Sequence, residues 1–168
     1  MVNPTHPAVD RVRAALQEHG LKPEIRWFDD AATTAVAAAA ELGIPVGAIA
    51  NSLVFTFTVP GRDPEPLLVL TSGAHRVDQA WLGARLGGVV GRASKELVKE
   101  STGQVIGGVS PVGHPSPLNT IVDEALAEFT VVWAAAGHAH TVFPTSFREL
   151  LRITGGEPGA VSAPIPEG

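Results

Sequence analysis

The stretch AIANSLVFTFTV, residues 48–59, contains the longest strand-like run of the chain. Apolar residues alternate with smaller or polar ones along its second half, which is the period of a strand with one face more buried. The turn-forming segment GRDPEP at 61–66 and the apolar run LLVLTSG at 67–73 come next, so the sequence predicts a β-hairpin. Two polar residues, Asn51 and Ser52, stand where the strand begins. They are explained either by turn and capping chemistry or by a place in a binding site.

Helices and further strands are predicted around this hairpin from apolar periodicity, capping residues and terminating glycines. The expected helices are Pro7–His19 with Thr5 as N-cap, 33–43, 75–88, 94–101 and 146–153, the last begun by a Ser146–Glu149 capping box. The expected strands are Glu24–Phe28, 89–90, 118–126 and 128–137 around a turn or short helical piece at Asp123–Ala127, and 141–143. This mixture predicts an α/β (α+β) fold with a mixed or antiparallel sheet, not a doubly wound one.

The length of 168 residues is typical of one domain and allows a sizeable buried core. We expect a single compact domain over residues 1–154. The remaining segment, residues 155–168, is rich in glycine and proline, and we expect it to be a frayed tail.

The charge balance limits the classes of partner. The formal net charge is −5 and the sequence pI is about 5.6, which argues against tight, sequence-independent binding to a phosphate backbone and so against a DNA-binding protein. Aromatic residues make up only 5% of the chain, and tyrosine is absent, so a base-stacking platform is not expected. A pocket that takes only the end of a nucleic acid remains compatible with this composition.

The chain contains no cysteine, which rules out disulfides, thiolate metal sites and cysteine nucleophiles. Its first residues lack the basic and apolar regions of a signal peptide, and no run approaches the roughly 18–20 apolar residues of a membrane span. The sequence therefore predicts a cytoplasmic protein without a membrane partner.

The segment GGVSP, Gly107–Pro111, is the most unusual local feature. Consecutive glycines allow a ligand to approach the backbone closely and leave main-chain N–H groups free to donate. The segment is neither a P-loop nor a G-x-G-x-x-G fingerprint. A plain turn between elements explains it equally well from the residues alone.

Two other kinds of site find weak support. His138 and His140 form an H-x-H pair, which on a strand would project from one face and could join His75, His114 or Asp123 around a metal. A third ligand with motif spacing is missing, so no metal is predicted. A serine hydrolase is also disfavoured, because the chain contains no G-x-S-x-G nucleophile elbow.

Several segments, taken in order, resemble the YbaK/EbsC-type family, which comprises free-standing aminoacyl-tRNA deacylases and the editing domain of bacterial prolyl-tRNA synthetases. They run from AVAAAAELGIPVGAIANSLVF through LLVLTSGAHRVDQAWLGARLG to WAAAG, and the resemblance spans roughly Ala31–Ile153. The string T-G-x-x-x-G-G-V-S-P-x-G, Thr102–Gly113, is its most specific part. The resemblance implies a mixed, curved and partly closed sheet flanked by helices.

The resemblance also implies an activity, namely trans editing by hydrolysis of the ester between a mischarged amino acid and the terminal adenosine of a tRNA. The implied partners are the tRNA acceptor end and an aminoacyl-tRNA synthetase, and no cofactor is implied. An ordered water and the ribose hydroxyl would do the chemistry, and a rigid backbone would stabilise the developing oxyanion. The implied substrate-binding residues are Gly107, Gly108, Val109, Ser110, Pro111, Asp123 and His138.

The resemblance departs from the family pattern where the first strand begins. Ser52 matches the family's Ser/Thr, but Asn51 stands where the family has a lysine, and we assign both residues to the catalytic site. Asparagine keeps a donor but loses the charge and the reach of lysine. Three explanations stay open: a different substrate, another cation such as Arg76 or Arg92 in its place, or lost catalysis. In the last case the domain would be a non-catalytic binding module for an aminoacyl or nucleotide-like ligand.

Overall fold

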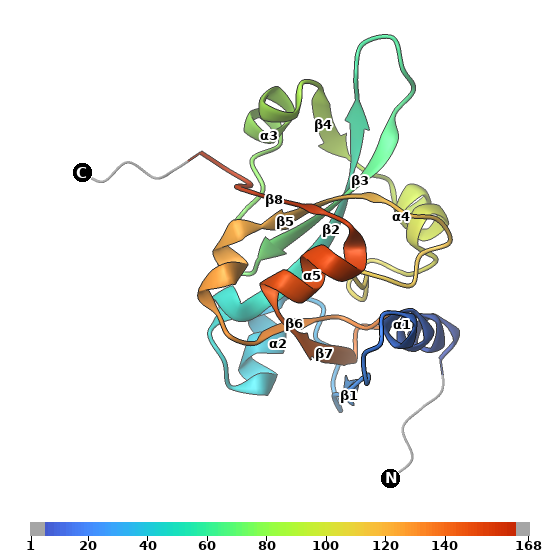
Figure 1. The fold of residues 1–168 in the computed structure, drawn as a ribbon, viewed down its shortest axis with the longest axis vertical. Helices are drawn as coiled ribbons and strands as arrows, with labels where there is room; N and C mark the ends of the chain where they lie inside the picture. The colour runs from blue at the N-terminus through green and yellow to red at the C-terminus, as the bar shows by residue number, and fades with distance from the viewer. Residues whose placement is uncertain (1–5, 164–168) are drawn as a thin grey trace, which may run out of the picture.

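The hairpin predicted from residues 48–73 lies at the centre of the sheet. In the computed structural model, which describes residues 6–163, strand β2 (Ile49–Thr58) pairs antiparallel with β3 (Glu65–Ser72). The register runs from Ala50 opposite Ser72 to Phe57 opposite Glu65. Figure 1 shows the hairpin extending beyond the rest of the molecule at its turn.

Six further strands complete the sheet around this hairpin. The order is β1-β7-β6-β2-β3-β5-β8, and β4 pairs with β2 off this path. Their bounds are β1 (Arg26–Trp27), β4 (Val89–Arg92), β5 (Asn119–Asp123), β6 (Val132–Ala134), β7 (Thr141–Thr145) and β8 (Glu157–Gly159). The pairs β2–β6, β3–β5 and β5–β8 are parallel and the others antiparallel, which confirms the mixed sheet. The partial closure that the resemblance implied is wrong for the described residues, where the sheet is open because β1 and β8 at its two ends do not pair.

In the described part of the chain, five α-helices flank the sheet, in the order that the sequence predicts. They are α1 (Pro7–Glu18), α2 (Ala35–Leu42), α3 (Gln79–Leu86), α4 (Lys95–Thr102) and α5 (Phe147–Thr154), with 3-10 turns η1 (Val46–Ala48) and η2 (Glu124–Glu128). Side chains of Thr34, Asp78, Ser94 and Ser146 accept the capping hydrogen bonds of α2 to α5. The longest of these helices has 12 residues, and none of the described helices could cross a membrane.

Three local predictions are corrected. The N-cap of α1 is His6, whose Nδ1 accepts the Ala8 N–H, and the predicted cap, Thr5, lies outside the described residues. The H-x-H pair lies in a turn before β7, not on a strand. The C-terminal segment is not frayed from residue 155: β8 pairs with β5, and Val161 is only 1% exposed.

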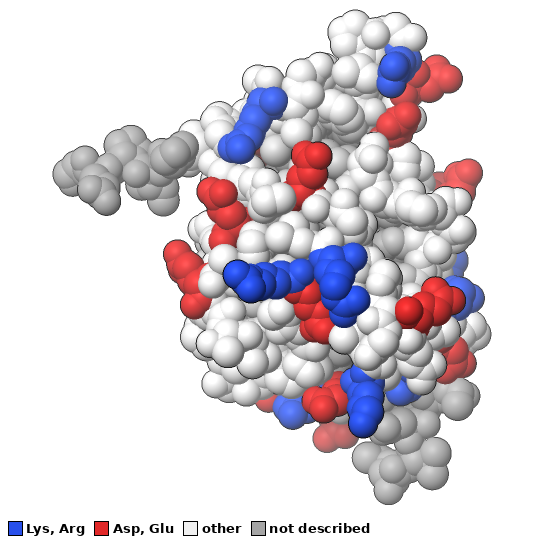
Figure 2. Space-filling view, viewed as in Figure 1, with Lys and Arg blue, Asp and Glu red and all other residues white. Residues whose placement is uncertain are grey.

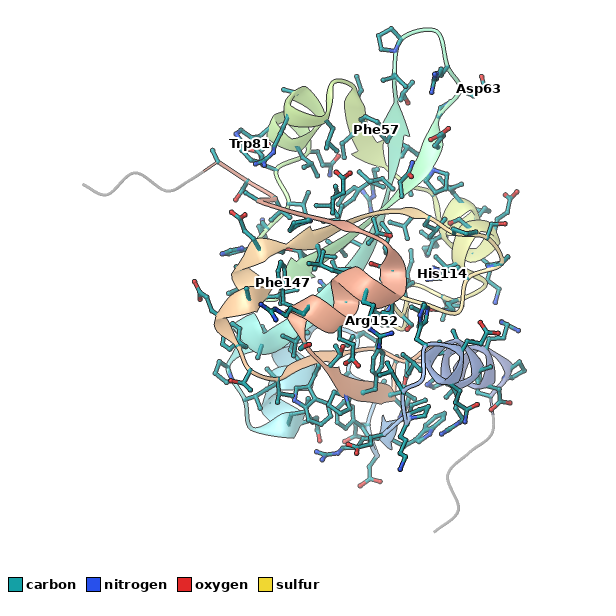
Figure 3. The ribbon with its side chains drawn as sticks, viewed as in Figure 1. Phe57, Asp63, Trp81, His114, Phe147 and Arg152 are labelled. Atoms are coloured by element: carbon teal, nitrogen blue, oxygen red, sulfur yellow. The ribbon has the colours of Figure 1, made fainter. Side chains whose placement is uncertain are left out.

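The side chains of β2 and β3 alternate between two apolar clusters. Leu68 and Leu70 pack on one face with Leu150 of α5, which Figure 1 shows lying across the front of the sheet. Phe55 packs on the other face, where Phe57 and Trp81 (Figure 3) also contact the cluster. The strand period predicted for β2 is therefore confirmed, and each face of the hairpin has its own cover.

Candidate functional site

The site begins at a break in the pairing of β2. One edge of this strand pairs with β3, whereas the other edge pairs with β6 at Ile49–Ala50 and with β4 at Phe55–Thr58. Residues 51–54 lie between these two partners, and within the described part of the chain they pair with no strand on that edge. The break leaves main-chain donors and acceptors available to a ligand.

A cavity of about 600 Å³ lies at this break. Its volume is within the range of about 300–1,000 Å³ that is usual for small-ligand sites. The lining includes Asn51, Ser52, Thr71, His75, Arg76, Arg92, Gly107 and Val109. The structure thus brings together four of the residues that the sequence assigned to the site, and they come from β2 and from the Gly107–Pro111 loop.

Ser52 lines the cavity, and the environment of its hydroxyl group is unusual. Its Oγ is buried and has no hydrogen-bond partner, and no other buried side-chain polar atom of the described residues lacks one. A buried hydroxyl without a partner costs about 1–3 kcal/mol, so such atoms are rare outside sites that receive a ligand or water. Asn51 precedes it and lies opposite Thr71 in the register.

The lining is cationic although the protein is acidic. Arg76 and Arg92 are both exposed, and the cavity lining contains no aspartate or glutamate. Among the described residues no aspartate or glutamate lies within ion-pair distance of either arginine, because the one contact of that length joins His75 and Asp123. On the face covered by α5, by contrast, Figure 2 shows basic and acidic side chains interspersed, without a broad field of one sign. Positive charge is available to an anionic ligand at the cavity.

Asp123 lies behind the cavity and does not line it. The carboxylate, on a residue only 1% exposed, accepts hydrogen bonds from Ser72 N at 2.9 Å, Thr71 Oγ1 at 3.3 Å and Ala125 N at 3.0 Å. Oδ2 also lies 2.9 Å from His75 Nδ1. Asp123 therefore orients two residues that do line the cavity, Thr71 and His75.

The Gly107–Pro111 loop is held in place by hydrogen bonds to a buried glutamine side chain. The Gln104 side chain, 1% exposed, accepts from Ser110 N at 2.6 Å and donates to Val112 O at 3.2 Å. Ser110 and Pro111 are buried and outside the cavity lining, and His114 Nε2 (Figure 3) lies 2.8 Å from Ser110 O. Burial lowers the pKa of His114, and the hydrogen bond to Ser110 partly opposes this. The second half of the loop is thus structural support.

Gly108 and His138 contact each other outside the cavity. A Cβ at Gly108 would lie 2.7 Å from main-chain atoms of His138, so no larger residue fits without a backbone shift. The His138 ring contacts the His6 ring edge-on and the His140 ring at a tilt, with ring centroids 4.9 and 5.2 Å away. Burial, followed by the charges of these two histidines, lowers the pKa of His138. His138 therefore supports the loop through its backbone.

The histidine cluster is arranged for hydrogen bonding. Nδ1 of His6 and Nδ1 of His138 each accept a main-chain N–H, at 3.2 and 3.1 Å. When Nδ1 of a neutral imidazole accepts a hydrogen bond, its proton is on Nε2, and that nitrogen cannot bind a metal. A metal-bound imidazole instead donates from its second nitrogen, so these two rings could not bind a metal through Nε2 and keep these bonds. Among the described residues no group of three or more candidate ligands is arranged to hold a metal ion.

Comparison with known proteins identifies the class. A family model described as "Aminoacyl-tRNA editing domain" matches residues 29–153. A solved structure described as "a putative trans-editing enzyme for prolyl tRNA synthetase" is 35% identical, with a TM-score of 0.85 over 96% of this chain and all of that one. The fold and these matches define an aminoacyl-tRNA editing domain. The chain belongs to the YbaK-type editing family, as its sequence motifs indicate.

Two further relatives have no described activity. The Bacillus subtilis (strain 168) protein YwhH, called uncharacterized, is 26% identical over 85% of this chain and 88% of its own length. The structure of the hypothetical protein APE2540 is 26% identical, with a TM-score of 0.81 over 91% of this chain and 99% of that one. The similarity covers nearly the whole of each relative, so the domain architecture is shared along the chain.

Proposed function

We propose that this protein is a trans-acting deacylase, which hydrolyses the ester bond of a mischarged aminoacyl-tRNA in the cavity at the β2 break. The observation that supports this most is the combination found there: a free strand edge, an unpartnered Ser52 hydroxyl and a glycine loop, beside two arginines and no carboxylate. An aminoacyl ester at the end of a nucleic acid is neutral at its reacting carbonyl and anionic at its phosphates. These features match both parts of such a ligand.

The reaction needs a water and an oxyanion site. The water oxygen attacks the ester carbonyl carbon, the bond to the ribose oxygen breaks, and that oxygen takes a proton, which leaves a free amino acid and a free ribose hydroxyl. Gly107 and Val109 line the cavity, and their main-chain N–H groups donate to no described residue. They are the proposed donors to the developing oxyanion, a role in which one donor is worth about 10²–10³ in rate.

Arg76 and Arg92 are the proposed replacements for the charge that Asn51 lacks. Both line the cavity and neither has an acidic partner among the described residues. A hydrogen bond to a charged group is worth about 1.5–3 kcal/mol, against about 1 kcal/mol for a neutral pair. Replacing Arg92 by glutamine should therefore raise KM for aminoacyl-tRNA several-fold. Arg62, in the turn beyond β2, is the matched control.

The test is hydrolysis of a panel of mischarged tRNAs by the pure protein, measured as release of labelled amino acid above the uncatalysed rate. Hydrolysis of at least one member is expected. No hydrolysis of any member would contradict the proposal. If a non-hydrolysable aminoacyl-adenosine analogue nevertheless bound, the result would favour the alternative, a non-catalytic binding module.

A further inference from the structure

The cavity lining contains one side chain of a type that can act as a general base. Among the described lining residues, the only ionisable side chains are His75, Arg76 and Arg92. Arginine stays protonated and cannot act as a base. A side-chain base for the attacking water, if the lining supplies one, is therefore His75.

The backbone of the turn that carries His75 is fixed by hydrogen bonds to its neighbours. Its main-chain N–H donates to Ser72 O at 2.9 Å, and Ser72 Oγ donates to Gly47 O at 2.8 Å. Gly73 N adds a bond of 2.8 Å to Ile49 O, at the beginning of β2. The turn after β3 is thereby fixed to the strand that forms the site.

The partner of the ring fixes its tautomer. The Asp123 carboxylate, 2% exposed, lies 2.9 Å from His75 Nδ1, and a carboxylate accepts, so Nδ1 carries the proton. In neutral imidazole Nε2 is then the free acceptor. The His75 side chain is 44% exposed and lines the cavity, whereas Asp123 is buried behind it. A buried carboxylate on one ring nitrogen of a histidine that lines a cavity is the arrangement expected of a His–Asp general base.

We infer that His75 is the general base of the proposed deacylation and that Asp123 is its positioning residue; this inference rests on the proposed function. His75 Nε2 takes a proton from the water as its oxygen attacks the ester carbonyl. The same proton then passes to the departing ribose oxygen, so the imidazole ends neutral. Asp123 holds the Nδ1–H tautomer and stabilises the transient imidazolium.

The charged groups around the ring set the expected pH dependence. Asp123 faces it from β5, Arg76 follows it in the turn, and Arg92 lines the same cavity from β4. A general base takes a proton only when it is itself unprotonated, so the hydrolysis rate should rise with pH from the acid side. Removing the imidazole should abolish this rise.

The experiment measures kcat, KM and the pH–rate profile of wild-type protein, His75→Ala, Asp123→Asn and the exposed control His19→Gln. We expect His75→Ala to lose about 10²–10⁴-fold in kcat, with little change in KM and partial rescue by added imidazole. Asp123→Asn should lower kcat at least ten-fold, and His19→Gln should match wild type. Because Asp123→Asn removes a buried acceptor and can unfold, the His75 tautomer is also measured in the wild type by ¹⁵N NMR, where protonated Nδ1 is expected.

The outcomes separate this inference from the proposed function. A wild-type protein that hydrolyses no substrate would overturn both. An active wild type whose His75→Ala variant keeps the rate and the pH profile would overturn the inference alone, as would a neutral His75 protonated at Nε2. Loss of the rise with pH, together with rescue by imidazole, would support it, since a merely structural role predicts neither.

Discussion

Replacing Gln104 by leucine tests whether the loop beside the cavity is held from within. The change removes the acceptor of Ser110 N–H and the donor to Val112 O, and both of these residues are buried. Each unsatisfied buried group costs about 1–3 kcal/mol, so the free energy of unfolding should fall by about 2–6 kcal/mol. For a chain of this size that lowers the Tm by at least about 4 °C. Misplacing the Gly107 and Val109 amides should also lower kcat/KM for deacylation at least about ten-fold.

The assays are thermal unfolding by circular dichroism and steady-state hydrolysis of aminoacyl-tRNA. The matched control is Gln17→Leu, which makes the same chemical change at an exposed position of α1. Gln17→Leu should leave both quantities near wild type. A Gln104→Leu protein with an unchanged Tm and unchanged kcat/KM would refute the reasoning, because the loop would then be held by other contacts.

Four further predictions follow from the same contacts. Gly108→Ala should impair hydrolysis, because its Cβ would lie 2.7 Å from the His138 backbone, whereas Gly159→Ala, with its nearest contact at 3.8 Å, should match wild type in the same assay. Ser52→Ala should leave the free energy of unfolding in urea unchanged or raise it by about 1 kcal/mol, because it removes a buried unpartnered hydroxyl, yet weaken binding of an aminoacyl-adenosine analogue. Asn51→Lys should lower KM for aminoacyl-tRNA by about ten-fold and steepen its salt dependence, since it adds a cation to the cavity lining. The lowered pKa of His138 means that the unfolded chain binds more protons, so urea titrations should show stability falling as the pH drops below about 6.5, and less steeply in His138→Gln.

A specific experimental result would contradict each of these four predictions. Equal damage from the two glycine changes would show that the Gly108 contact is not special. A large loss of stability in Ser52→Ala would mean that its hydroxyl has a structural partner. Unchanged kinetics in Asn51→Lys would mean that Asn51 is a residue of β2 with no part in substrate binding. A stability that is flat between pH 5 and 7, or identical in His138→Gln, would contradict the account of the histidine cluster.

The parts of the fold that depend on nearby residues could be predicted from the sequence. The β2–β3 hairpin follows from a period of two on either side of a turn, and the start of α5 follows from its Ser146 cap. The strand β8 could not be predicted, because Glu157–Gly159 is short, rich in turn formers and ordered only by parallel pairing with β5. Long-range pairing of this kind overrides local propensity.

The residues of the candidate site could also be predicted only in part from the sequence. Motif order singled out Asn51, Ser52 and the Gly107–Pro111 loop, and Asn51, Ser52, Gly107 and Val109 line one cavity, whereas the rest of the loop does not. Gln104 and His75 received no such role, because their partners determine what they do. Gln104 reaches across its own loop, and His75 meets a carboxylate 48 positions away. The sequence carried no signal for the role of Gln104, because its burial, which makes both amide atoms need partners, is visible only in the structure.

The central claim is that the ester end of the substrate binds at the break in β2. Amide chemical-shift mapping with a non-hydrolysable aminoacyl-adenosine analogue tests it most directly. We predict the largest shifts at residues 51–54, at Gly107 and Val109, and in the turn that contains His75. Shifts confined to another surface, such as the groove between Lys99 and Val105 beside α4, or no shifts at millimolar analogue, would contradict the account.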